Sequence, residues 1–164
     1  MRVIGIDPGT YNMGVGIVDS EGSGLNMVHV TVFSRKKSDP MPTRLLYLFQ
    51  ELGNLISNFS PDSVAIEQPF VSKNVRSALA IGQAQSVAMI ATAKAGLEIT
   101  GYSPSQVKQA VTDYGASSKE QVQEMVRALL ELDYAPSPTD ATDALAVAIC
   151  HINSVESLYL TLNP

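Results

Sequence analysis

The sequence is poor in residues that several classes of protein require. Its single cysteine, Cys150, excludes a disulfide within the chain and predicts a reducing, cytoplasmic location. It has no apolar run of about 18 residues and no signal-peptide pattern at its start, so we expect no membrane span and no export. Neither His29 nor His151 has the Cys/His spacing of a zinc site, and we expect both to be structural.

Basic residues are also scarce. The chain has 11 Lys and Arg against 16 Asp and Glu, which gives a formal net charge of −5. This balance argues against a nucleic-acid partner, because neutralisation of phosphates by Lys and Arg supplies most of that binding energy. The basic residues nevertheless concentrate between residues 34 and 119, and they include the run Arg35-Lys36-Lys37. That run is either a solvated loop or a contact to phosphate.

The chain is long enough, at 164 residues with 45% hydrophobic residues, for one domain with a substantial core. We expect this domain at residues 1–155, followed by a short C-terminal tail at 156–164. Internal repeats, low-complexity segments and domain linkers are absent from the sequence.

Hydrophobic periodicity predicts an α/β fold. The expected strands are 1–7, 13–19, 25–33, 63–67 and 97–102, and the expected helices are 42–58, 77–95, 104–112, 117–132 and a last helix from residue 139. Short links between the first three strands predict an antiparallel meander, and the strand that follows the first helix should lie parallel to the first strand. Ser117 and Glu120 are expected to form the capping box that begins one of the helices.

The helix at 77–95 has an unusual composition. It is rich in alanine and other small residues, and it carries larger apolar residues around much of its circumference. A helix that is apolar on more than one face is buried on more than one side. The second side is covered either by the same domain or by a partner subunit.

Two predicted strands end on a carboxylate. Asp7 ends the first strand before Pro8-Gly9, and Glu67 ends the strand at 63–67. Because these strands are expected to be parallel neighbours, the two carboxylates should lie side by side at one edge of the sheet. An unpaired buried charge costs several kcal/mol, so a carboxylate at a strand end suits the binding of a cation. The alternative for Asp7 is that it only forms an Asp-Pro-Gly turn.

The last predicted helix begins with two more acids. Asp140 and Asp143 are three residues apart, which places them on one helical face with Cβ atoms about 5–6 Å apart. The helix dipole alone would favour acids there, by roughly 0.3–1 kcal/mol. The nearly all-apolar helix beyond Asp143, however, predicts that this end docks against the sheet. Four carboxylates without a paired base describe an oxygen-ligand site for Mg²⁺ or Mn²⁺, in which metal-activated water would attack a phosphodiester.

The order of elements and several motifs resemble the RuvC family of bacterial Holliday junction resolvases, within the ribonuclease H and retroviral-integrase superfamily. The resemblance spans about residues 2 to 153. It implies a ribonuclease H-like fold with a central mixed five-stranded sheet flanked by helices. The matching blocks are Gly5-Ile6-Asp7-Pro8-Gly9, Ala65-Ile66-Glu67-Gln68, Lys73-Asn74 with Ser77-Ala78-Leu79, Gly82-Gln83-Ala84, Gln106-Val107-Lys108-Gln109 and Asp140-Ala141-Thr142-Asp143-Ala144-Leu145-Ala146.

The resemblance implies a homodimeric bacterial endonuclease that cuts two strands of like polarity at a four-way DNA junction. It implies two Mg²⁺ ions per active site, with Mn²⁺ as the alternative, and delivery of the junction by a branch-migration motor complex. The catalytic and metal-binding carboxylates it implies are Asp7, Glu67, Asp140 and Asp143. Lys108 and Lys119 take the positions of catalytic cations near the scissile phosphate, and Phe70 takes the position of an aromatic residue that meets a base. Lys73 and Arg76 are further expected DNA contacts.

Three alternatives stay open. Residues 5–10 also resemble the first phosphate loop of actin-like ATPases and sugar kinases, but those folds need two such domains and 164 residues are too few. A second alternative is a junction-binding protein without catalysis. The third is a related nuclease that acts on another structured nucleic acid, such as a flap or an RNA–DNA hybrid.

Overall fold

The fold is built on one mixed sheet, seen in a computed structural model that describes residues 1–22, 24–68 and 74–162. The strands are β1 (Arg2–Asp7), β2 (Asn12–Glu21), β3 (Gly24–Ser34), β4 (Ser63–Glu67) and β5 (Ile99–Tyr102). Their order in the sheet is β3-β2-β1-β4-β5. The first three strands pair antiparallel, whereas β4 lies parallel to β1 and to β5. The predicted α/β fold with a mixed five-stranded sheet is confirmed.

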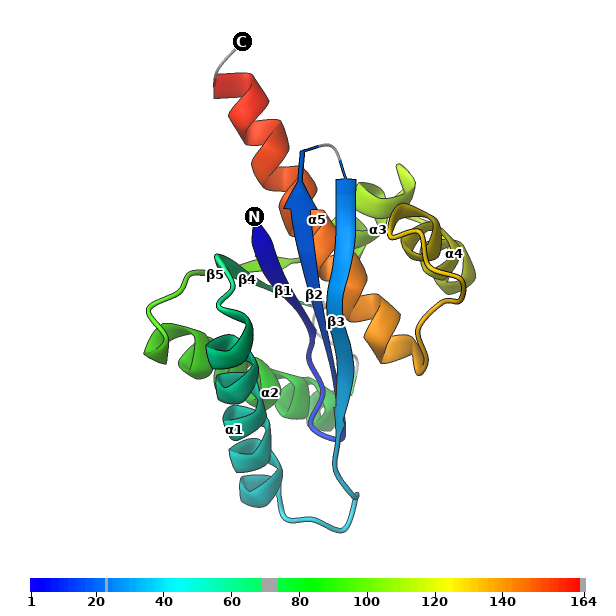
Figure 1. Ribbon diagram of the computed structural model, residues 1–164. Coiled ribbons are helices and arrows are strands. Elements are labelled where there is room, and N and C mark those ends of the chain that lie inside the picture. Colours follow the sequence, from blue (N-terminus) through cyan, green and yellow to red (C-terminus); the bar gives the residue numbers. More distant parts are fainter. Residues whose placement is uncertain (23, 69–73, 163–164) are drawn as a thin grey trace.

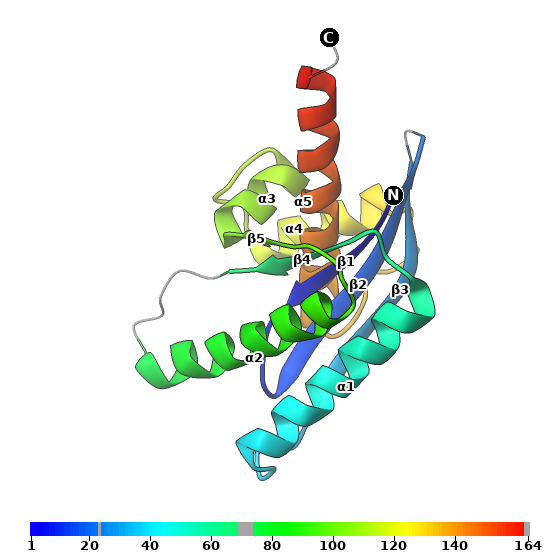
Figure 2. The same cartoon turned by 90° about the vertical axis from the view of Figure 1, so that its left-hand side faces the viewer.

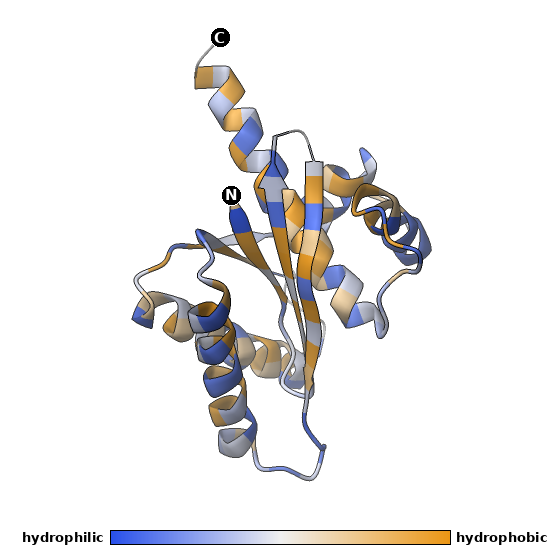
Figure 3. Ribbon diagram, in the orientation of Figure 1, coloured by the Kyte–Doolittle hydropathy of each residue, from blue (hydrophilic) through white to orange (hydrophobic). Residues whose placement is uncertain are grey.

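Helices cover both faces of the sheet (Figures 1 and 2). They are α1 (Met41–Phe59), α2 (Val75–Lys94), α3 (Pro104–Thr112), α4 (Lys119–Leu129) and α5 (Thr139–Leu162). Successive side chains of a strand point to opposite faces, and Val3 accordingly packs in the core under α5 while Ile4 packs in the core under α1 and α2. Burial on both faces explains why the central strands are nearly continuous apolar runs, visible as long orange segments in Figure 3.

The backbone of α5 lies directly on β1 and β2, because those strands carry glycine where the helix crosses them. A Cβ atom on Gly5 would overlap the carbonyl oxygen of Ala144 and lie 2.5 Å from the amide nitrogen of Ala148. A Cβ atom on Gly14 would overlap the carbonyl oxygen of Asp140. This close approach brings the first turn of α5 to the edge of the sheet at which β1 ends.

The helix α5 is also longer than expected. The residues predicted as a tail from 156 onward continue α5 as an exposed helix to Leu162, which projects past the sheet in Figure 1. The division into a domain at 1–155 and a tail stays a prediction. By length and mean hydropathy of 1.4 alone, α5 could cross a membrane. Its residues from Ala141 to Ile152 are almost all buried inside the fold, however, which is the pattern of a core helix.

Replacing Gly5 by alanine is expected to destabilise the protein by about 1–3 kcal/mol or more, because the added methyl group has no room under α5. The matched control is Gly53→Ala in α1, where a Cβ atom meets nothing within 4 Å. That change should stabilise the protein by up to about 1 kcal/mol, because alanine favours a helix interior. Denaturant unfolding of both variants measures the two effects, and equal stability of the two variants would contradict the close packing of α5.

Candidate active site

Acidic side chains from separate elements meet at the edge of the sheet where β1 and β4 end. Ile6 pairs with Ile66, so the next residues, Asp7 and Glu67, are neighbours at that edge. Together with Asp143 of α5 they line a cleft of about 220 Å³. The remaining lining residues are Pro104, Val107, Lys108, Lys119 and Val122.

The setting of the cleft raises the pKa of two of its acids. Burial, together with the neighbouring charges of Glu67, Asp143 and Asp140, raises the pKa of Asp7 to about 7, while Lys119 opposes this rise. Burial and the charge of Asp143 likewise raise the pKa of Glu67, against the opposing charges of Lys119 and Lys108. A cation placed among these acids would lower the pKa values of Asp7 and Glu67 again.

Lys119 is the cation closest to this group. Its Nζ atom lies 3.0 Å from Oδ2 of Asp143, and this hydrogen bond raises the pKa of the lysine. The ammonium group is half-exposed, so it faces both the acids and the solvent. It is placed to meet an incoming anion at the mouth of the cleft.

Lys108 has a different immediate partner. Its Nζ atom donates a hydrogen bond of 2.7 Å to the carbonyl oxygen of Ser117, in the turn between α3 and α4. The side chain thereby ties α3 to that turn, while its charge lowers the pKa of Glu67. The hydrogen bond of Lys108 therefore holds the turn in position.

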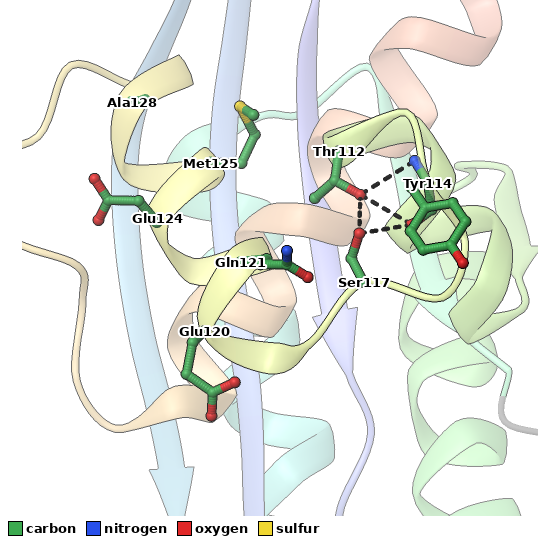
Figure 4. A pocket seen from close by; sticks show the side chains of 8 residues that line it. All are labelled: Thr112, Tyr114, Ser117, Glu120, Gln121, Glu124, Met125 and Ala128. Atoms are coloured by element: carbon green, nitrogen blue, oxygen red, sulfur yellow. Dashed lines mark hydrogen bonds between the residues drawn. The ribbon is translucent and has the colours of Figure 1, made fainter.

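The turn that precedes α4, and with it Lys119, is fixed by a hydroxyl network (Figure 4). The hydroxyl groups of Thr112 and Ser117 lie 2.7 Å apart, and each donates to the carbonyl oxygen of Tyr114. The cap of α4 is accordingly Ser118 with Gln121, one residue later than the Ser117–Glu120 box expected from the sequence. The expectation was wrong because the hydroxyl of Ser117 is already bonded within the turn.

A larger hollow of about 490 Å³ lies beside α4, on the side drawn in Figure 4. The charged residues that line it are Glu120 and Glu124. Such a surface repels phosphate, and none of the four predicted catalytic acids borders it. The smaller acid-lined cleft is therefore the better candidate site.

The donor set suits a hard divalent cation, because the acids offer only carboxylate oxygens. The raised pKa values of Asp7 and Glu67 point the same way. Within residues 1–22, 24–68 and 74–162, however, no three His, Cys, Asp or Glu side chains are close enough together to hold one ion in common. The carboxylates thus lie near one another without forming a closed coordination shell. Asp143 forms an ion pair with Lys119.

The structure does not place the other predicted site residues in the lining of the cleft. Asp140 lies in the first turn of α5 and raises the pKa of Asp7, but it does not line the cleft. Arg76 lies in the first turn of α2, also outside the residues that line the cleft. Phe70 and Lys73 lie outside the described residues.

Gln85 is a residue near the site that the sequence patterns did not single out. Its Nε2 atom donates a hydrogen bond of 3.1 Å to the carbonyl oxygen of Glu67. This contact ties the middle of α2 to the end of β4, next to the carboxylate. Its polarity alone did not mark it out, because α2 also carries Gln83 two residues earlier.

A mixed five-stranded sheet, with acids at the ends of β1 and β4 and on a final helix that crosses them, is the arrangement of a ribonuclease H-like nuclease. Residues 3–151 match the family model for crossover junction endodeoxyribonuclease RuvC. The chain belongs to the RuvC family.

Bacterial relatives match almost the whole chain. The RuvC crossover junction endodeoxyribonuclease of Dehalococcoides mccartyi is 48% identical over 151 residues, which is 92% of each chain. That of Chloroflexus aggregans is 47% identical over 158 residues, or 96% of each chain. All four predicted catalytic acids fall inside the matched region.

Solved structures agree with the fold. Thermus thermophilus RuvC in complex with a Holliday junction substrate superposes with a TM-score of 0.92 at 33% identity, over 96% of each chain. The yeast mitochondrial Holliday junction resolvase Ydc2 has a TM-score of 0.73 at 16% identity, covering 98% of this chain and 81% of its own, and shares the fold.

The raised pKa of Asp7 predicts a pH-dependent stability without divalent cations. The folded state holds a proton on Asp7 up to about pH 7, whereas the unfolded state loses it near the ordinary value of 3.8. The folded state therefore binds more protons in this window, so stability falls as pH rises from about 4 to about 7. Asp7→Asn should flatten this slope and raise the free energy of unfolding at pH 8 by roughly 1–4 kcal/mol.

The matched control is Asp19→Asn, at the far end of the same hairpin. Arg2 lowers the pKa of Asp19 through a paired hydrogen bond, so its negative charge stabilises the fold at pH 8. Denaturant unfolding in EDTA should show the control losing stability at pH 8. A loss of stability in both variants would contradict the crowding of acids around Asp7.

Proposed function

We propose that this protein is a structure-specific endonuclease that resolves four-way (Holliday) DNA junctions by paired symmetric nicks. The observation that carries the proposal is the acid cleft, in which Asp7, Glu67 and Asp143 meet with Lys119 at its mouth. Family membership and the likeness to a RuvC bound to a Holliday junction substrate support the choice of DNA junction as substrate.

The cofactor we propose is Mg²⁺, as two ions per site, with Mn²⁺ able to substitute. Bound there, the metal would supply activated water and stabilise charge on the attacking and leaving oxygens. Asp7, Glu67, Asp140 and Asp143 would hold it. The raised pKa of Asp7 supports this assignment, because a carboxylate crowded by other acids gains most from a nearby cation.

Two lysines of the chain are proposed to bring the scissile phosphate of the DNA to the cleft. The half-exposed ammonium of Lys119 can exchange Asp143 for a phosphate oxygen without being buried. Lys108 holds the turn before α4 through Ser117 and so keeps Lys119 at the cleft. In this assignment Lys119 contacts the substrate, and Lys108 positions the turn and adds positive potential.

The homodimer is part of the same proposal. A four-way junction has approximate two-fold symmetry, and paired nicks need two active sites, which a two-fold dimer supplies. The outer face of α2 supports this helix as part of the interface, because Leu79 and Ile90 are 64% and 58% exposed there. The DNA contacts of Phe70, Lys73 and Arg76 stay predictions, as do delivery by a branch-migration motor and a cytoplasmic location in a bacterium.

A nicking assay on a synthetic mobile four-way junction with Mg²⁺ tests the proposal, beside a linear duplex of the same sequence. Wild type should make symmetric paired nicks on the junction only. Asp7→Asn should reduce nicking by a factor of about 10³ or more and leave junction binding nearly unchanged, because it removes a metal-binding charge from the site. Asp19→Asn, which lies outside the cleft, is the matched control and should cleave as wild type does.

The alternatives give different results in the same assay. Junction binding without nicking at any Mg²⁺ or Mn²⁺ concentration would replace the nuclease with a junction-binding protein. Nicking of flaps or RNA–DNA hybrids in preference to the junction would reassign the substrate.

Lys119→Ala should slow cleavage by tenfold or more at saturating enzyme, because the transition state would lose a nearby positive charge. Lys119→Arg should recover part of the rate. Lys94→Ala, on the exposed end of α2, is the control and should cleave at the wild-type rate. Single-turnover cleavage measures the rates, and a wild-type rate in Lys119→Ala would exclude a role at the phosphate.

A further inference from the structure

A second group of cations lies at the same edge of the sheet, in the segment that joins β3 to α1 and in the first turn of α1. Residues 35–44 contain four basic residues and one acid, in a chain that is acidic overall. The amide of Arg35 donates a hydrogen bond of 2.8 Å to the carbonyl oxygen of Tyr11, in the turn between β1 and β2. This bond anchors the basic segment to the turn that begins directly after Asp7.

Two of these cations converge on one exposed aromatic ring. The guanidinium carbon of Arg44 lies 4.1 Å from the ring centroid of Tyr11, and Nζ of Lys37 lies 5.9 Å from it. The tyrosine is 41% exposed, and Lys36, which precedes Lys37 in the sequence, is exposed as well. Arginine, lysine and tyrosine side chains are all regular donors to phosphate oxygens.

Arg44 has no counter-charge among the residues that the structure describes. Only 5% of the residue is exposed, and its Nη1 atom donates to the hydroxyl of Thr10 at 3.2 Å. Its buried Nε atom has no hydrogen-bond partner, and no carboxylate of the described residues forms an ion pair with it. A buried charge without a partner is costly, so an anion close to Arg44 would offset that cost.

We propose that Tyr11, Lys36, Lys37 and Arg44, called here the Tyr11 patch, bind the phosphate backbone of a duplex arm of the DNA substrate. The inference rests on the proposed function, because it takes the same DNA as the ligand. In this site Arg44 fixes the ring of Tyr11 and supplies buried positive charge, while the two exposed lysines and the tyrosine hydroxyl contact phosphate oxygens.

The position of the patch fits a contact that flanks the cut. Tyr11 follows Asp7 by four residues, so the two lie at most about 14 Å apart along an extended chain. That reach corresponds to about four base-pair steps of 3.4 Å along a duplex. The patch also explains how a chain with a net charge of −5 presents positive potential to DNA.

Salt dependence of junction binding in EDTA, measured by fluorescence anisotropy, tests the patch. Each lost phosphate contact lowers the slope of log affinity against log salt by about 0.9. The double variant Lys36→Ala/Lys37→Ala should therefore lose about 1–2 units of slope and bind severalfold more weakly at 50 mM salt. A linear duplex should show the same change, because the patch contacts the backbone and not the branch point.

The control is Lys94→Ala, which removes an exposed lysine with a comparable contact, 5.4 Å from the ring of Phe49. It should keep the wild-type slope. Tyr11→Phe keeps the ring and removes the hydroxyl, and it should weaken binding by less than the double variant. Equal thermal midpoints confirm that the variants are folded.

The outcomes separate the two proposals. If wild type nicks the junction and the double variant keeps the wild-type slope, the patch is refuted and the proposed function stands. If the slope falls equally in the double variant and in Lys94→Ala, only general charge matters, and the patch is refuted. If wild type neither binds nor nicks the junction, the proposed function fails and the patch loses its ligand.

Discussion

The contact between the backbone of α5 and the glycines of β1 and β2 is the constraint on which the site depends. Gly5 and Gly14 leave no space for a side chain under Ala144 and Asp140. The helix can approach so closely only because these positions lack a Cβ atom. The first turn of α5, near the end of the chain, is thereby fixed beside the end of β1, near its start. The carboxylates gather because two backbones touch.

That gathering has an electrostatic cost, which the surrounding residues limit. Burial and the neighbouring carboxylates raise the pKa of Asp7 to about 7, and the positive charge of Lys119 opposes part of this rise. The same lysine is paired with Asp143 and is largely exposed. In the proposed function, this arrangement suits ligands of either sign: cations among the acids, and a phosphate beside Lys119.

The fold was largely predictable from local patterns, because strand periodicity and the acids at strand ends depend on residues that are neighbours in the sequence. Contacts that join distant segments were not predictable in the same way. Gln85 of α2 contacts Glu67, and Arg44 of α1 contacts the ring of Tyr11. No short sequence motif predicts either contact. The cap of α4 was misplaced by one residue for a similar reason, since the hydroxyl of Ser117 donates to the carbonyl oxygen of Tyr114 within the turn.

The dependence on α5 has a consequence for how the protein is made. The cleft combines residue 7, from β1, with residue 143, from α5, so it depends on a contact between residues that are far apart in the sequence. A chain emerging from the ribosome contains β1 and β2 early. The surface at Gly5 and Gly14 stays uncovered, however, until α5 has been synthesised. The acid cleft is therefore complete only after residue 143 has been synthesised and α5 has docked on the sheet. A chain that stopped before residue 140 would lack both Asp140 and Asp143 and would leave Asp7 and Glu67 without their partners from α5.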